Sequence, residues 1–171
     1  MNLYKIFRIS DALYLWLLGI GIGCIVAEGL AASVVFTISS FLPQLSTSDS
    51  GVIMGQIFVR CNGFFNILAG IIIIYEVITL LSAELFARSN QRRLWFIIGG
   101  ISVIMIFLFT LYYTPFIMEA QAAGNLGTPE FDSMHKQSEL VFKILMVSLS
   151  VSLIWRAIIG STPASTSAPK A

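Results

Sequence analysis

His135, Glu139 and Lys143 follow one another at intervals of four residues in the segment "DSMHKQSELVFKILM", which then becomes apolar. Side chains four residues apart occupy successive turns of one face of an α-helix. Glu139 can therefore form an ion pair with Lys143, and the imidazole of His135 can gain or lose a proton near neutral pH. The spacing predicts a stripe of ionisable side chains at the start of an apolar helix.

The composition predicts that this helix lies in a lipid bilayer. Of the 171 residues, 57% are hydrophobic and 11% are charged, whereas a soluble domain carries about 25% charged residues. The hydrophobic residues form long runs, as they do in membrane-spanning helices. A net charge of +1 gives no reason to expect a nucleic-acid partner. Cys24 and Cys61 lie in apolar segments, so we expect structural thiols rather than a disulfide framework.

Four apolar segments are long enough to cross about 30 Å of hydrocarbon. They are residues 12–41, 54–81, 94–113 and 140–159. Their short connections predict an all-α membrane protein, an antiparallel bundle of four transmembrane helices. We expect residues 1–159 to form this membrane domain, and residues 160–171, which are small and polar, to form a disordered cytoplasmic tail.

The distribution of lysine and arginine predicts the orientation, because these residues are enriched in the short loops that face the cytoplasm. They occur at the amino terminus, between the second and third segments, and near the carboxyl terminus, as Lys5, Arg8, Arg88, Arg92, Arg93, Arg156 and Lys170. The first connection has none, and the third has only Lys136. We expect a multi-pass protein of the bacterial inner membrane with both termini in the cytoplasm.

Small residues recur every four positions along the first segment, as Gly19, Gly23, Ala27 and Ala31. Such a stripe lets a neighbouring helix approach closely, and close packing is a main source of helix association in lipid. We expect a helix of the same chain to pack there, with self-association as the alternative.

Polar and charged side chains interrupt the apolar segments. They are Glu28, Arg60, Asn62, Asn66, Glu76, His135, Glu139 and Lys143. A charge in the bilayer centre costs about 3 kcal/mol or more, so we expect Glu28 to face the bundle interior, to be paired or to be protonated. The set is either a polar seam that fixes the register of the helices or a polar cleft that opens to the outside.

The residue types favour a protein that is not an enzyme. With one histidine, the chain lacks the paired axial ligands of a haem bundle and the ligand set of a catalytic zinc site. We therefore expect no catalytic residues, no cofactor and no metal site. The leading hypothesis is an accessory or assembly partner of a larger membrane complex. The alternative is a small transporter or a copper-handling protein, because Met54, Met118, Met134 and His135 are ligands that suit Cu(I).

Several short motifs carry a resemblance to a known family. They are "AASVVF", "SGVIMGQIFVRCN", "YYTPFI" and "FDSMHKQSELVFKILM". Together they resemble the bacterial branch of a family of four-span membrane proteins that is classified as a domain of unknown function. Its eukaryotic relatives are transmembrane proteins associated with resistance to platinum drugs. The resemblance implies the same four-span architecture, and the positions that match its pattern are Gly55, Tyr113, Pro115, His135 and Ser138.

Overall fold

The computed structural model describes residues 3–38, 40–42, 44–81 and 89–160. All the described elements are helical: α1 (Leu3–Ile38), α2 (Thr47–Leu81), α3 (Ser89–Phe107), the π-helix η1 (Leu108–Tyr113), α4 (Thr114–Ala122) and α5 (Pro129–Gly160). Because α3, η1 and α4 follow one another without a break, the described chain contains four helical segments that are long and apolar enough to cross a membrane. The predicted all-α four-helix membrane bundle is confirmed.

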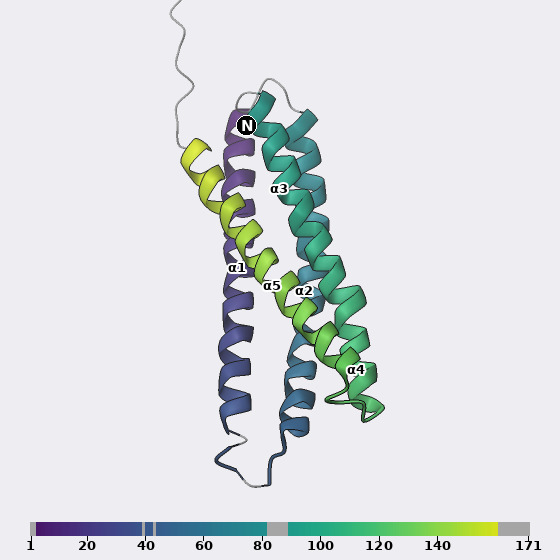
Figure 1. Cartoon of the computed structure of the whole chain (residues 1–171). Helices are drawn as coiled ribbons and strands as arrows, with labels where there is room; N and C mark the ends of the chain where they lie inside the picture. Colours follow the sequence, from purple (N-terminus) through teal and green to yellow (C-terminus); the bar gives the residue numbers. More distant parts are fainter. Residues whose placement is uncertain (1–2, 39, 43, 82–88, 161–171) are drawn as a thin grey trace, which may run out of the picture.

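The four long segments run alternately up and down (Figure 1). α1 and α3 each pack against both α2 and α5. We call the end where α1 begins and α5 ends the N-terminal end, and the opposite end, with residues 40–42, 44–46 and 123–128, the distal end. α5 crosses the bundle diagonally, from beside α1 at the N-terminal end to beside α4 at the distal end (Figure 1).

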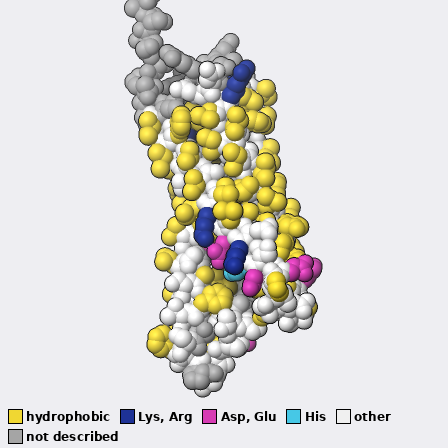
Figure 2. All heavy atoms as spheres, in the orientation of Figure 1, with side chains coloured by type: hydrophobic (Ala, Val, Ile, Leu, Met, Phe, Trp, Pro, Cys, Tyr) yellow, Lys and Arg dark blue, Asp and Glu magenta, His cyan; other side chains and the backbone are white. Residues whose placement is uncertain are grey.

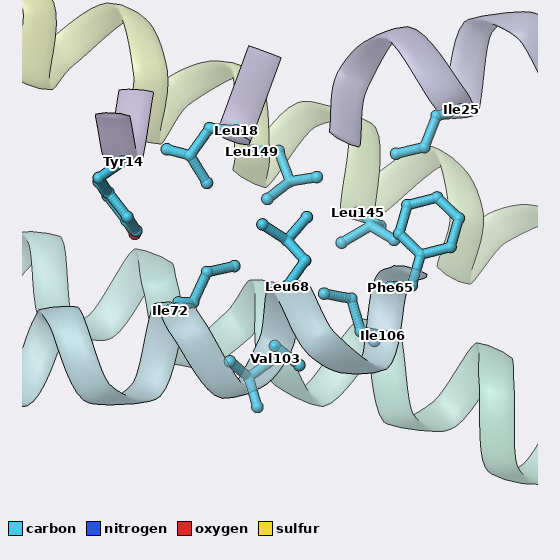
Figure 3. Close-up of a cluster of buried hydrophobic side chains, with 11 residues drawn as sticks. Tyr14, Leu18, Ile25, Phe65, Leu68, Ile72, Val103, Ile106, Leu145 and Leu149 are labelled. Atoms are coloured by element: carbon cyan, nitrogen blue, oxygen red, sulfur yellow. The ribbon is translucent and has the colours of Figure 1, made fainter. Parts of the chain in front are cut away.

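The core is built from one face of each helix. On α1 this face carries Tyr14, Leu18 and Ile25, which are spaced by four and seven residues and are all buried. Leu18 meets Leu68 of α2 and Leu149 of α5 in the middle of the bundle (Figure 3). This apolar centre separates two regions of polar side chains, one at each end.

The third segment is longer than the sequence predicts. We expected it to end at Tyr113, before Pro115, but the helix continues to Ala122. Proline normally breaks a helix because its ring meets the carbonyl of the residue four positions earlier. Here the backbone widens first: the amide of Thr114 donates to the carbonyl of Phe109, five residues back, and the Thr114 hydroxyl donates to the same oxygen at 2.8 Å. The π-helix therefore accommodates Pro115 within a continuous helix.

Local caps fix the ends of the distal helices. Ser46 and Asp49 form a capping box at the start of α2, with the Ser46 amide donating to the Asp49 carboxylate at 2.8 Å. Thr128 caps α5 by accepting a hydrogen bond from the Phe131 amide at 3.2 Å. α5 thus begins at Pro129, well before the predicted residue 140, and the predicted tail beyond Gly160 lies outside the described residues.

Candidate functional site

Arg156 lies at the centre of a buried charged cluster at the N-terminal end. Its side chain is 2% exposed. Its Nη2 atom lies 3.2 Å from Oε2 of Glu76 on α2, and its Nη1 atom lies 3.7 Å from Oδ1 of Asp11 on α1. The hydroxyl of Tyr14 donates to Oε1 of Glu76 at 2.8 Å, and the hydroxyl of Tyr75 donates to Asp11 at 3.1 Å.

Three aromatic rings surround the same guanidinium group. The Cζ atom of Arg156 lies 4.9 Å from the ring centre of Tyr14, 5.0 Å from that of Tyr75 and 4.5 Å from that of Trp95. A cation over an aromatic face is attracted by the ring quadrupole, and more strongly where water is excluded. The cluster joins side chains of α1, α2, α3 and α5, so it links all four of these helices at the N-terminal end of the bundle.

The sequence reasoning predicted only one member of this cluster, Glu76. Arg156 was assigned to the cytoplasmic flank as a topology signal, whereas the structure buries it inside the bundle. The sequence does contain a signal for the burial of Arg156. The residue falls within the apolar segment 140–159, and a charge in such a segment needs a partner.

Glu28 is the buried carboxylate of α1, in the distal half of the bundle. The residue is 2% exposed, and neither carboxylate oxygen has a hydrogen-bond partner of ordinary geometry among the described residues. The thiols of Cys24 on α1 and Cys61 on α2 lie close enough to interact with it electrostatically. The structure therefore places Glu28 in the interior, as expected, without an ion pair to a cation among the described residues.

The polar residues of α2 separate into two groups. Asn62 is buried, and Asn66 accepts a hydrogen bond from the Thr110 hydroxyl of η1 at 2.7 Å. Arg60, by contrast, is exposed. The prediction that Arg60 belongs to the interior polar seam is therefore wrong. Arg60 and Asn62 are two residues apart, which corresponds to about 200° around the helix, so Arg60 lies on the outer face.

The stripe of His135, Glu139 and Lys143 lies on an exposed face of α5. His135 Nε2 is 3.5 Å from Glu139 Oε1, and Lys143 Nζ is 3.1 Å from Glu139 Oε2. These three side chains are 49%, 51% and 69% exposed, so they form a ladder on the surface and not an interior seam. Charged side chains and the histidine gather in the lower half of this face, below a broad apolar band (Figure 2).

The small-residue stripe of α1 also faces outward. A Cβ atom on Gly23 would meet nothing within 4 Å, Ala27 is exposed, and Gly19 and Ala31 are partly buried. The close approach occurs instead at Gly21, where a Cβ would come within 2.7 Å of Leu68 Cδ2. The expectation that the stripe packs against a helix of the same chain is therefore wrong for its central residues, because the core face of α1 lies two residues away.

A cavity of about 560 Å³ lies at the distal end, between α2, η1, α4 and α5. Most of its lining is apolar, and Met54, Met118 and His135 all contribute to it. Gly55 lines it too, where any side chain would collide with Met118: a Cβ would lie 2.5 Å from the Sδ atom. Ser138, at the same wall, donates its hydroxyl to the carbonyl of His135 at 2.7 Å.

Exposed charges and a tyrosine mark a boundary on the side of this cavity that faces the N-terminal end. At 1.5 Å per residue, Arg60 lies about 32 Å from Leu81, where α2 reaches the N-terminal end of the bundle. Lys143 lies about 26 Å from Gly160, where α5 reaches the same end. Tyr112, which is 55% exposed, lies about 29 Å from Arg93 along the third segment. These lengths match the ~30 Å hydrocarbon core, so the distal parts of α2 and α5 extend beyond it.

The fold and this surface define a multi-pass integral membrane protein. The family described as a domain of unknown function, DUF4149, matches residues 16–126, and the chain belongs to that family. No curated protein and no solved structure matched the chain. The described residues contain no group of three or more histidine, cysteine or acidic side chains placed to hold a metal ion.

Proposed function

We propose that the protein is a non-enzymatic accessory subunit that holds a transmembrane helix of a larger membrane complex against α1. The observation that carries the proposal is the open space beside Gly23, where an added Cβ would meet no atom within 4 Å. Ala27, one turn further along the same face of α1, is also exposed. Small residues on a lipid-facing surface let a second helix approach closely, which favours association in lipid.

Site-specific crosslinking in the native membrane tests this proposal. A photoreactive amino acid at position 23 is expected to form an adduct with a different membrane protein, and the same group at Gly63, which is open on α2, is expected to form none. A second substitution, Ala27→Leu, is expected to remove the adduct because the added side chain keeps the partner helix away. An adduct with a second copy of the chain, or equal adducts from both positions, contradicts the proposal.

Soft-metal handling is the second candidate. It is supported by the convergence of Met54, Met118 and His135 on one cavity, since thioether and imidazole groups suit Cu(I). Met134 does not line this cavity but packs against Phe109 and its neighbours. The resemblance to relatives associated with platinum-drug resistance favours the same chemistry. Titration of the purified protein with Ag(I), a redox-stable substitute, is expected to show binding that Met54→Leu and Met118→Leu weaken; no binding by the wild type excludes this candidate.

The accessory proposal includes an orientation in the bacterial inner membrane. It places the N-terminal end of the bundle in the cytoplasm, supported by Lys5, Arg8, Arg92 and Arg93 near that end. The distal cavity then faces the outside.

A further inference from the structure

The distal cavity has the size and the walls of a site for an aliphatic chain. Its volume of about 560 Å³ falls within the ~300–1,000 Å³ of ligand-binding pockets. Its apolar lining includes Met54, Phe58, Met118 and Phe142. Methionine side chains are flexible and polarisable, so a wall that contains them can adapt to a ligand without a fixed shape.

The cavity reaches the outer surface of the bundle near the distal end of α1. Phe36 lines the cavity and is itself 41% exposed. Glu139 and Phe142 line the cavity next to the boundary marked by Tyr112 and Lys143, so a hydrocarbon chain can enter it from the bilayer there.

One edge of the cavity is polar. Glu139 lines it and pairs with Lys143, so an acid and a base lie together beside the opening. Gln121 also lines it, and its Oε1 atom is buried without a hydrogen-bond partner in the part of the chain that the structure describes. An amphiphile with an apolar chain and a charged head group matches this division, because its head group can remain beside the ion pair while its chain lies among the aromatic rings.

We propose that the distal cavity binds one acyl chain of a bilayer phospholipid, whose head group lies beside Glu139 and Lys143. The proposal is independent of helix docking on α1, because neither Gly23 nor Ala27 lines the cavity. A phospholipid is the occupant that the position favours, since the cavity reaches the bilayer boundary at Phe142 and has the ion pair of Glu139 and Lys143 at its edge.

Photolabelling of the full chain tests the proposal. The protein is placed in nanodiscs of phosphatidylethanolamine and phosphatidylglycerol, doped with a phosphatidylethanolamine that carries a diazirine at the end of one acyl chain. Mass spectrometry is expected to find label on cavity residues such as Phe58, Met118 and Phe142, which ordinary lipid contact does not reach. Label confined to exposed residues such as Ile67 and Ile104 overturns the proposal.

Matched tryptophan substitutions locate the effect. Ile117→Trp adds bulk to the cavity wall, whereas Ile104→Trp makes the same change on the exposed face of α3. Loss of cavity label in the first variant and its retention in the second are expected. Delipidated protein provides a second measurement: added phospholipid is expected to raise the melting temperature of the wild type and Ile104→Trp, but not of Ile117→Trp.

A rim substitution keeps the test decisive where Ile117→Trp disturbs folding. Ser48 is exposed and lines the cavity, so Ser48→Trp narrows the opening without adding volume to the core. It is expected to reduce the cavity label in a protein that melts like the wild type. Cavity labelling that is the same in Ser48→Trp and Ile117→Trp as in the wild type contradicts an acyl chain in this site.

Discussion

Arg156 shows how one residue can hold an end of a membrane bundle together. A lone cation within hydrocarbon is costly, and here the cost is offset by two carboxylates and three aromatic rings. A buried ion pair of this kind contributes less to net stability than its geometry suggests, because both charges lose their hydration. Its main effect appears when one partner is removed, since the other charges then remain buried without compensation.

Arg156→Met is therefore expected to destabilise the protein by about 3–5 kcal/mol, because it leaves Glu76 and Asp11 without their buried cation. Thermal unfolding in mild detergent measures the change. The matched control is the double variant Arg156→Met, Glu76→Gln, which removes the uncompensated carboxylate and is expected to recover part of the loss. A double variant that is less stable than Arg156→Met alone contradicts the pairing.

Substitution of Glu28 is expected to have a different effect on stability from substitution of Arg156. Its carboxylate has no cationic partner among the residues described, so Glu28→Gln replaces a costly buried group with a less costly one. The melting temperature is expected to stay the same or rise. A marked drop indicates that the carboxylate makes a stabilising interaction in the membrane, as the polar-seam hypothesis requires, whereas loss of a cellular phenotype in a stable variant favours transport through this residue.

At the scale of the helices, substitutions at Gly21 and Gly23 of α1 distinguish the packed face from the face proposed to bind a partner. Gly21→Leu is expected to destabilise the bundle by about 1–3 kcal/mol or more, since its side chain collides with Leu68 in a packed interface. Gly23→Leu is expected to leave the melting temperature unchanged, because the added side chain enters open space. Equal losses in the two variants contradict the assignment of their faces.

Much of this helical architecture was predictable from hydrophobicity alone. The four segments and the antiparallel order follow from long apolar runs and short connections, which depend on composition rather than on contacts. The length of the third helix could not be predicted from hydrophobicity, because the π-helix that accommodates Pro115 depends on backbone geometry around Phe109. The four-residue spacing of small residues on α1 also did not identify the face that packs against other helices. Glycine occurs both where helices approach closely and on surfaces exposed to lipid.

The polar sites were predicted less completely than the helices. Sequence spacing placed His135, Glu139 and Lys143 on one face, and the structure has that ladder, but spacing within a helix does not say which face meets a neighbour. Glu76 was singled out without its partners, because Asp11, Tyr14 and Arg156 are brought to it by tertiary packing across more than sixty positions of sequence.

At the scale of the whole molecule, the bundle is longer than the membrane is thick. α1 and α2 contain 36 and 35 residues, and α5 contains 32, which correspond to lengths of about 48–54 Å. The hydrocarbon core needs only about 30 Å. The excess lies at the distal end, where it encloses the cavity, so the protein presents a small folded surface on one side of the bilayer.

Cysteine labelling tests which side that is. In a variant without Cys24 and Cys61, Asn125→Cys at the distal end is expected to react with a membrane-impermeant maleimide in spheroplasts. Gln91→Cys, near Arg92 and Arg93, is expected to react only after the membrane is permeabilised. The opposite pattern reverses the orientation and places the cavity in the cytoplasm.

The position of Arg156 near the end of the chain has a consequence for biosynthesis. Its carboxylate partners lie on α1 and α2, so a nascent chain presents Asp11 and Glu76 to the membrane before the ribosome has made their countercharge. Three inserted helices leave this acidic pair uncompensated, and only translation of the final helix neutralises it. A product that ends before α5 therefore lacks the cation that Asp11 and Glu76 contact in the folded bundle.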